Sequence, residues 1–392
     1  MSNGTVLYIG GFELPDKNAA AHRVLNNGKI LRELGYNVIF IDVDKSLKFN
    51  SNILETKKSV QGFECWSLPY PKSNREWIKY LTNIDSIKMI SDQYDEVKAI
   101  IAYNYQAIAL YRLKNYCHKH NVKIVADCTE WYSTKGSNIV FKIIKGFDSF
   151  LRMRIIQKQL DGLIVISKYL ENYYRHCRNV VRIPPLVDLA EEKWNIVPTE
   201  FVDNKVRFIY SGSPGKNKDK INRLIEALYE LKEYDNYVFN VFGITKEQYV
   251  NDYPYHREIL GVLGERINFF GRISHIDSIK SLKESDFSIF IRENTRLTNA
   301  GFPTKFVESL SCGIPVVTTN TSDLEDYIQD GENGFFIDLN ESKGIKEVIK
   351  KLLKYNQESI MEMKSKCLNS KPFYYKKFIQ VADTFIQNTL NK

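Results

Sequence analysis

Short apolar runs alternate along the chain with longer segments in which apolar residues recur every three or four positions. In the first half the runs are TVLYIG, NVIFIDV, KAIIAYN, VKIVADC, GLIVIS and VVRIP; in the second they are VRFIYSG, YVFNVFG, INFFG, DFSIFIR, IPVVTT and NGFFI. Runs that are apolar along most of their length are typical of strands covered by helices on both faces. The pattern therefore predicts an α/β protein built on doubly wound parallel sheets.

Two prolines interrupt both patterns in IPPLVDL, around residues 183–189, and indicate a hinge. A chain of 392 residues is also longer than one typical domain. We predict two Rossmann-like domains, 1–184 and 185–371, facing each other across a cleft, and a helix in 372–392 that packs back across them. Open parallel sheets bind ligands at the carboxyl ends of their strands, so the active site is expected in that cleft.

The composition narrows the class of protein only a little. Hydrophobic residues make up 43% and charged residues 26% of the chain, which is typical of a soluble globular protein. Lys and Arg exceed Asp and Glu by 55 to 47, and this excess favours anionic partners such as nucleotides or phospholipid headgroups. Six scattered cysteines without a C-x-x-C pair predict a reducing cytoplasm rather than disulfides or zinc. No apolar run approaches the roughly 18 residues of a membrane span, and no signal peptide is visible.

Two strands run directly into glycine turns. YIGGF ends the first strand with Gly10 and Gly11 before Phe12, and SGSPGKNKD in the second half places Ser213 before Lys216 and Lys218. Such turns let the backbone approach a ligand, and a nearby ammonium suits a diphosphate. The alternatives are an ordinary tight turn in the first case and a solvated lysine-rich turn in the second. The nicotinamide-binding G-x-G-x-x-G is absent.

AGFPTKFVESLSCGIPVV, residues 300–317, reads as a turn, a short helix and a buried strand. The start of a helix leaves backbone N–H groups unpaired, and the helix dipole there favours an anion. Upstream, GRISHID contributes the backbone of Arg272 and Ile273, and IRENTRLTN contributes Arg292 and Arg296, although isolated arginines are usually surface residues.

Carboxylates follow two strands of the first half. In DCTEWY, Asp127 and Glu130 are expected to point toward the cleft, where one of them could accept a proton from an acceptor hydroxyl. The alternative is a helix N-cap with an adjacent acid. Asp42 and Asp44 form a D-x-D pattern, but carboxylates are common where such strands end, and we expect no metal there.

The stretch GFPTKFVESLSCGIPVVTTNTSDLEDYIQDGENGFFI resembles the C-terminal signature of the retaining GT-B glycosyltransferases, the glycosyl transferases group 1 family, whose members use nucleotide-activated sugars. The GGF turn, IPPLVD, SGSPGKNKD and the C-terminal FYYKKFIQVADTFIQNTL follow the same layout, so the resemblance spans nearly the whole chain.

The resemblance implies roles for individual residues. Glu308 matches the second glutamate of an E-x7-E motif and would bind the ribose hydroxyls, and Arg272 with Ile273 would read the base. The donor diphosphate would be bound at the glycine turns, by the lysines and at the start of the helix, that is by Gly10, Gly11, Phe12, Ser213, Lys216, Lys218, Gly301, Phe302, Thr304 and Lys305.

The chain also departs from the family pattern. Ala300 occupies the position of the first motif glutamate, so Asn299, Arg292 or the Gly301 backbone would have to contact the donor sugar. The arginine that usually precedes the phosphate lysine is missing. The family's frequent catalytic histidine is not visible either, which leaves Asp127 and Glu130 as the catalytic candidates.

The resemblance implies a cytoplasmic, retaining, metal-independent hexosyltransferase without a cofactor. It would transfer a sugar from a nucleoside diphosphate to a glycan or lipid-linked acceptor in surface polysaccharide or glycoconjugate synthesis, and no nucleic-acid partner is expected. Two other functions stay open: a non-catalytic GT-B-like binding subunit, which Ala300 favours, and a nucleotide-sugar epimerase.

Residues 131–160 combine basic and apolar residues. Six cations, at positions 135, 142, 145, 152, 154 and 158, accompany the single acid Asp148. A basic amphipathic segment of this kind can lie among anionic lipid headgroups, which predicts peripheral contact with the inner face of a membrane. The alternative is a core-packing helix with a solvated basic face.

Overall fold

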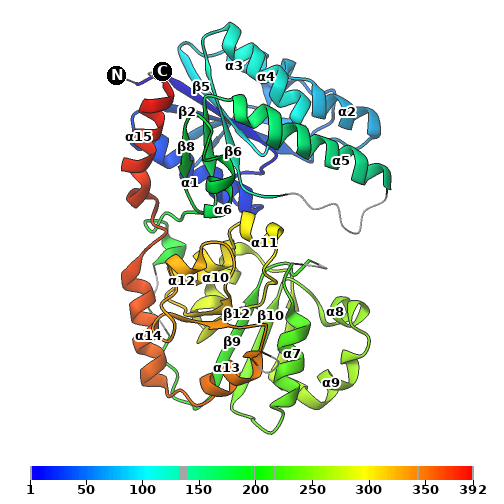
Figure 1. The fold of residues 1–392 in the computed structure, drawn as a ribbon, viewed down its shortest axis with the longest axis vertical. Coiled ribbons are helices and arrows are strands. Elements are labelled where there is room, and N and C mark those ends of the chain that lie inside the picture. The colour runs from blue at the N-terminus through cyan, green and yellow to red at the C-terminus, as the bar shows by residue number, and fades with distance from the viewer. Residues whose placement is uncertain are drawn as a thin grey trace. The chain divides into compact units, whose positions relative to one another are not determined.

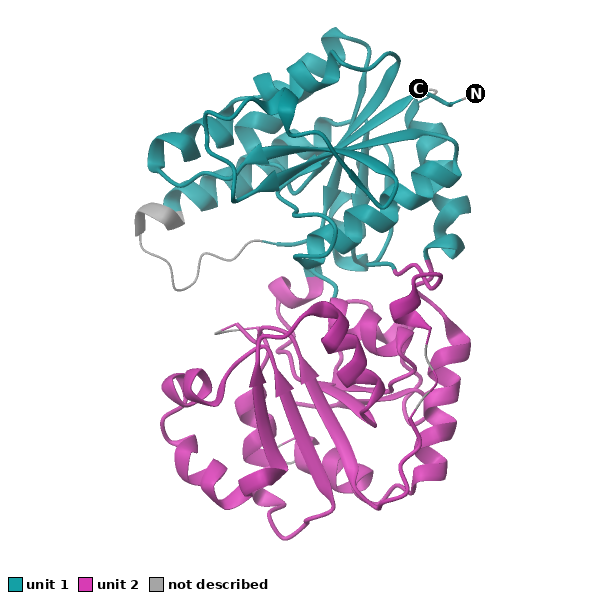
Figure 2. Cartoon of the chain, turned by 180° about the vertical axis from the view of Figure 1, so that it is seen from behind, with its two compact units in different colours: residues 1–186, 300–302, 375–392 teal, residues 187–299, 303–374 magenta. Residues whose placement is uncertain are grey.

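The structure is a computed structural model, and it describes residues 2–131, 139–195, 197, 199–215, 218–341 and 344–390, without the side chains of residues 139–142. The chain divides into two compact units, coloured in Figure 2. Unit 1 comprises residues 1–186, 300–302 and 375–392, and unit 2 comprises residues 187–299 and 303–374.

Unit 1 is built on an eight-stranded sheet with the strand order β3-β4-β2-β1-β5-β6-β7-β8. Figure 1 labels β2, β5, β6 and β8 of this sheet. All neighbouring strands are parallel except β3 and β4. The strands are β1 Thr5–Gly10, β2 Asn37–Asp44, β3 Lys58–Val60, β4 Phe63–Pro69, β5 Val97–Tyr103, β6 Lys123–Cys128, β7 Gly162–Val165 and β8 Val180–Arg182. The parallel sheet was predicted, but the β3–β4 pair was not.

The helices of unit 1 are α1 Ala19–Glu33, α2 Asn74–Thr82, α3 Asp85–Ser91, α4 Ala107–Lys119, α5 Ile139–Leu151, α6 Lys168–Tyr174 and α15 Ile379–Leu390. Helix α1 begins at a cap in which Asn18 Oδ1 accepts from Ala21 N. It packs so closely on the sheet that a Cβ at Gly28 would lie 2.4 Å from the Phe40 ring. Helix α15 packs against α1 (Figure 1). Tyr375, just before α15, donates to Glu33 Oε1 at 2.9 Å.

Unit 2 contains a six-stranded parallel sheet with the order β11-β10-β9-β12-β13-β14. Its strands are β9 Val206–Ser211, β10 Tyr237–Phe242, β11 Ile267–Gly271, β12 Phe287–Phe290, β13 Val316–Thr319 and β14 Gly334–Ile337. Its helices are α7 Ile221–Glu230, α8 Lys246–Asp252, α9 His256–Leu263, α10 His275–Lys283, α11 Arg296–Ala300, α12 Thr304–Ser311, α13 Gly344–Leu352 and α14 Gln357–Ser370.

A buried ion pair ties α14 to the start of β12 in unit 2. Lys364 Nζ lies 2.9 Å from Asp286 Oδ1, and neither side chain is exposed to solvent. The other carboxylate oxygen of Asp286 accepts from the backbone N–H of Arg207 in β9. Because the carboxylate bonds both to the lysine and to the backbone, it fixes the amino ends of two neighbouring strands, away from the edge where the glycine turns lie.

Candidate active site

Three neighbouring strands of unit 2 end in glycine turns that touch one another. Gly212 N donates to Phe242 O at 3.2 Å, and Gly243 N donates to Gly271 O at 2.7 Å. All three glycines have positive φ, and a Cβ at Gly243 would lie 2.3 Å from Gly212 O. Because no other residue fits this approach, the carboxyl ends of β9, β10 and β11 present backbone rather than side chains.

One buried carboxylate beside these turns holds two cations. Asp219 Oδ1 accepts from Arg292 Nε at 2.7 Å, and Asp219 Oδ2 accepts from Lys305 Nζ. The Tyr210 hydroxyl donates to Oδ2 as well, at 2.7 Å, and the Lys305 ammonium lies 3.9 Å from the Tyr210 ring centroid. Lys305 also borders the first turn, since a Cβ at Gly212 would lie 3.4 Å from its Nζ.

The electrostatics of this cluster leave it positive. Burial raises the pKa of Asp219, but Lys305 and Arg292 outweigh that effect and hold the pKa well below its usual value. Burial lowers the pKa of Lys305 to about 8, although Asp219 opposes the shift. Two cations share one carboxylate at neutral pH, so the cluster keeps an uncompensated positive charge next to a backbone-lined turn. This combination suits an anion such as a diphosphate.

The residues predicted to bind the diphosphate therefore lie in different surroundings. Lys305 lies in the cluster, whereas Ser213 and Lys218 are exposed on the loop that follows Gly212. Thr304 begins α12 beside Lys305, and Gly301 and Phe302 belong to unit 1. Lys216 lies outside the described residues.

Arg292 was expected near the donor sugar because it follows β12, but its Nε is bonded to Asp219 in the cation cluster. The neighbouring candidates have other partners. Asn299 Oδ1 accepts from Ser322 N at 2.8 Å, and its amide donates to Asn294. Ala300 is fully buried, and its carbonyl accepts from Ser167 Oγ at 2.9 Å.

Glu308 on α12 is oriented by a histidine on α10. His275 Nε2 lies 3.2 Å from Glu308 Oε1, and both side chains are mostly buried. His275 is the first residue of α10, behind the cap Ser274, so the helix start fixes its position. Arg272 and Ile273, the candidates for reading the base, are exposed on the short loop just before it. His275 was not singled out from the sequence, because 33 residues separate it from Glu308.

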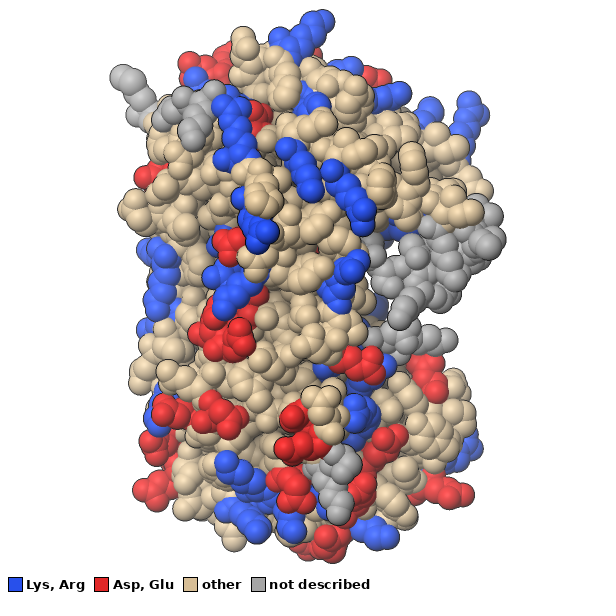
Figure 3. All heavy atoms as spheres, viewed as in Figure 1, with Lys and Arg blue, Asp and Glu red and all other residues tan. Residues whose placement is uncertain are grey.

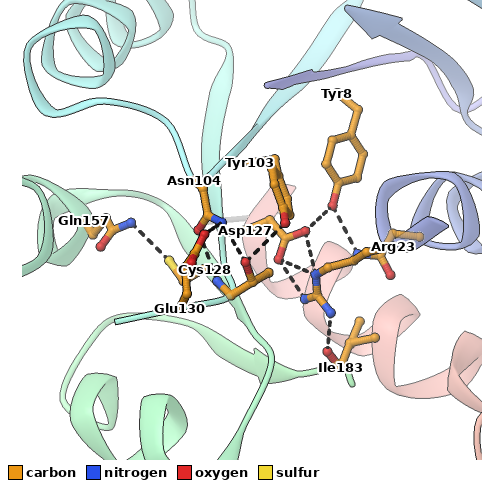
Figure 4. Close-up of polar contacts among 11 residues, drawn as sticks. Tyr8, Arg23, Tyr103, Asn104, Asp127, Cys128, Glu130, Gln157 and Ile183 are labelled. Carbon is orange, nitrogen blue, oxygen red and sulfur yellow. Dashed lines mark hydrogen bonds and ion pairs between the residues drawn. The ribbon is translucent and has the colours of Figure 1, made fainter. Parts of the chain in front are cut away.

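In unit 1, Asp127 is the centre of a buried network (Figure 4). Arg23 Nη2 lies 2.7 Å from its Oδ1 and Arg23 Nε lies 3.0 Å from both carboxylate oxygens, while the Tyr8 hydroxyl donates to Oδ2 at 2.6 Å. Arg23 also donates to Ile183 O at 2.8 Å. Burial, followed by the Asp127 charge, raises the pKa of Tyr8 well above its usual value. Asp127 was expected to point toward an acceptor, but this fully buried carboxylate instead fixes the ends of strands and helix α1.

Glu130 is differently placed, on the surface that follows β6. Asn104, in a left-handed conformation with φ +43°, donates from Nδ2 to Thr129 Oγ1 at 2.6 Å and to Glu130 Oε1 at 3.2 Å (Figure 4). Thr129 N donates back to Asn104 Oδ1 at 3.2 Å. Glu130 is exposed, so it can meet a ligand while Asn104 orients it.

The first glycine turn is only partly open. A Cβ at Gly10 would lie 2.9 Å from the Tyr103 carbonyl, so this glycine is needed for strand packing. Phe12 was expected at the diphosphate, but its ring is fully buried between Tyr8, Phe40 and Tyr103. Only Gly11 is exposed in this turn.

The two aspartates of the D-x-D pattern have separate partners. Asp42 accepts from Ser67 Oγ at 2.6 Å and pairs with Lys58, whereas Asp44 caps Ser46. Burial raises the pKa of Asp42, although hydrogen bonds from Ser67 and Lys58 oppose the shift. Within the described part of the chain, no three His, Cys, Asp or Glu side chains cluster as metal ligands would. In that same part, no helix combines the length and apolar character needed to cross a membrane.

Comparison with known proteins relates part of the chain to a family of glycosyltransferases. Residues 192–367 match the family model described as glycosyl transferases group 1. A curated relative, the capsular polysaccharide biosynthesis glycosyltransferase CapM of Staphylococcus aureus, is 24% identical over 188 residues. That match covers 41% of this chain and spans about half, 48%, of CapM.

Solved structures match over the full length. Sucrose-phosphate synthase from Thermosynechococcus elongatus has a TM-score of 0.73 at 14% identity, covering all of both chains. Alr3699/HepE from Anabaena, in complex with UDP and glucose, has a TM-score of 0.66 at 15% identity, covering 97% of this chain and 99% of that one. At these identities the likeness establishes the fold, and the predicted GT-B class is confirmed.

Proposed function

We propose, because residues 192–367 match the model of the glycosyl transferases group 1 family, that this chain belongs to that family and transfers a hexose from a nucleoside diphosphate to an acceptor, with retention of configuration. The observation that supports this most is the pair of cations, Lys305 and Arg292, held on Asp219 beside the Gly212 turn. The leaving nucleoside diphosphate gains negative charge as the glycosidic bond to the sugar breaks. Preorganised positive charge at that point stabilises the transition state without a metal ion.

Glu308 would bind the ribose. A carboxylate can accept from two adjacent hydroxyls at once, and the bond to His275 restricts its orientation before the donor arrives. Exposed Arg272 and Ile273 would lie against the base. Lys218 and Ser213, on the loop after Gly212, would add outer contacts to the diphosphate, as would Thr304 at the start of α12.

Glu130 is the proposed acceptor-side carboxylate. It is exposed and oriented by Asn104, as a group that accepts a proton from an acceptor hydroxyl must be. Asp127 is better explained as the residue that holds Arg23 and Tyr8, because a fully buried carboxylate has no access to an acceptor.

The choice of donor and acceptor to test first comes from the relatives. HepE has been solved with UDP and glucose, so UDP-hexoses are the first donors to try. CapM is named for capsular polysaccharide biosynthesis, so the proposed acceptor is a glycan or lipid-linked glycan of the cell surface. All six cysteines are free and five are buried, which fits a reaction in the reducing cytoplasm.

The test is a panel of nucleotide sugars, scored by nucleoside diphosphate release with and without glycan acceptors. Acceptor-dependent release, with a product that keeps the anomeric configuration of the donor, supports the proposal. A donor sugar altered without any acceptor would indicate an epimerase. Tight donor binding without turnover on any acceptor would indicate the non-catalytic subunit that Ala300 favours.

A further inference from the structure

Helix α5 exposes large apolar side chains on one face. Ile143 is 67%, Ile144 59%, Phe147 64% and Phe150 50% exposed. Spacings of three and four residues place Ile143, Phe147 and Phe150 on the same side of the helix, and Ile144 lies at its margin. Single exposed apolar residues are common on protein surfaces, but a contiguous group on one helix face marks an interaction site.

The opposite side of the helix makes specific contacts with the rest of unit 1. The exposed apolar side chains therefore do not belong to the side of the helix that packs on the core. Asp148 Oδ1 accepts from Ala107 N at 2.8 Å and so caps the start of α4. Arg152, only 2% exposed, donates to Asn104 O at 3.4 Å. Met153, one residue further on, is buried in unit 1. These contacts fix which side of α5 faces outward.

The surroundings of the exposed face are basic. Arg154 and Lys158 follow it as exposed residues, with the Arg154 guanidinium 5.2 Å from the Phe150 ring centroid. Asp148 is the only acid in residues 143–160, and its carboxylate is directed at α4 and Arg152. Figure 3 shows Lys and Arg side chains, with few acidic ones nearby, over the region that Figure 1 labels α4 and α5.

Helix α4 packs against α5 and also exposes apolar side chains. Ile108 and Tyr111 are one turn apart in its first half, and each is nearly half exposed. We call the exposed side chains of Ile108, Tyr111, Ile143, Ile144, Phe147 and Phe150 the α4–α5 face.

We propose that the α4–α5 face binds an anionic lipid bilayer, with Phe147 and Phe150 entering the boundary between headgroups and acyl chains and Arg154 and Lys158 contacting lipid phosphates. Amphipathic helices with large apolar residues and a basic margin bind membranes in this way. A second copy of the chain fits less well. A twofold contact across this face would bring the basic residues of one copy close to the same basic residues of the other, and like charges repel. The proposal does not depend on the proposed sugar transfer, since lipid binding can be measured without turnover.

The sequence predicted membrane contact for residues 131–160. The structure adds which side chains of this segment are exposed and so available for that contact. Residues 132–138, including Lys135, and the Lys142 side chain lie outside the described residues, so the proposal is carried by residues 143–158 and α4.

The experiment is co-sedimentation of the full chain with vesicles of phosphatidylcholine alone or with added phosphatidylglycerol. The protein should pellet with the anionic vesicles and not with the neutral ones, and salt should release it. The double variant Phe147→Ser, Phe150→Ser should weaken vesicle binding at least tenfold. Arg154→Gln and Lys158→Gln should weaken it about fivefold each at low salt.

The matched control is the double variant Met89→Ser, Val262→Ser, which removes two exposed apolar side chains outside the α4–α5 face. It should sediment with anionic vesicles as the wild type does. Thermal unfolding of every variant separates loss of binding from loss of fold. The proposal is overturned if anionic vesicles do not pellet the folded wild type, or if the α5 double variant pellets like the wild type. It is also overturned if the wild type sediments as a dimer that the α5 double variant converts to a monomer, because the face would then be an interface between copies.

Discussion

Arg292 donates from Nε to Asp219 Oδ1 over 2.7 Å, although 73 residues separate the two in the chain. The other oxygen of the same carboxylate holds Lys305, from a third segment. Asp219 thus joins the loop after β9, the end of β12 and the start of α12. Its role is to hold two cations at the edge of the sheet where the glycine turns lie.

We predict that Asp219→Asn destabilises the protein strongly, because it leaves two buried cations without their counter-charge. Removing one partner of a buried ion pair typically costs about 3–5 kcal/mol. The free energy of unfolding, measured by urea denaturation, should fall by that order. The exposed Asp235→Asn is the control and should change the free energy by less than about 0.5 kcal/mol. A loss as small as that for Asp219→Asn would show that the cluster is not an energetic unit.

The pKa of Lys305, lowered to about 8, predicts a pH dependence of donor binding. The ammonium is charged below this pKa and loses its charge as the pH rises through it, so nucleoside diphosphate affinity should fall above pH 8. The fall should be about tenfold between pH 7 and pH 9, as for the linkage of one proton to binding. Calorimetry with the nucleoside should show no such fall. In Lys305→Arg the charge persists, so a fall of the same size in that variant would assign the pH effect to another group.

Replacing Glu308 by Gln should weaken nucleoside diphosphate binding about tenfold to hundredfold, because a hydrogen bond to a charged group is worth about 1.5–3 kcal/mol. The ribose contact is shared by nucleoside and diphosphate, so both ligands should lose affinity by the same factor. His275→Ala should give a smaller loss, and His275→Gln, which can still donate to Glu308, should recover part of it. Unchanged affinity in Glu308→Gln would remove Glu308 from the site.

Substitution of the two carboxylates of DCTEWY should affect different properties: stability for Asp127 and turnover for Glu130. Asp127→Asn should lower the free energy of unfolding by about 3–5 kcal/mol, because Arg23 would remain buried without its charge partner. Glu130→Gln should leave stability unchanged and lower turnover about a hundredfold or more, as expected for loss of a group that moves a proton. Full turnover in Glu130→Gln would exclude it as the acceptor-side carboxylate.

The sequence predicted the parallel sheets because buried parallel strands are long apolar runs, and those runs are plain in both halves. It did not predict β3 and β4. In β4, FECWSLP, Glu64 and Ser67 interrupt the apolar run, as strands near a sheet edge allow. The sequence also singled out Lys305 as a candidate, because it lies in a distinctive motif at a helix start.

The partners of the site residues could not be read in the same way. In the sequence, Asp219 is one acid in a lysine-rich turn, and His275 is one residue of a helix start. Their contacts join segments far apart in the chain, which spacing along a sequence does not encode. The same limit applies to Asp127: its position after a strand is visible, but the burial of its side chain against Arg23 is not.

The central claim is that Lys305, held by Asp219, binds the donor diphosphate. Its most direct test is calorimetric titration of UDP, ADP and GDP, and of the matching nucleosides, into the wild type, Lys305→Met and Lys218→Met. We predict that one diphosphate binds the wild type, that Lys305→Met loses at least tenfold in its affinity with nucleoside affinity unchanged, and that exposed Lys218→Met loses less. Equal losses for diphosphate and nucleoside in folded Lys305→Met, or no loss at all, would contradict the claim.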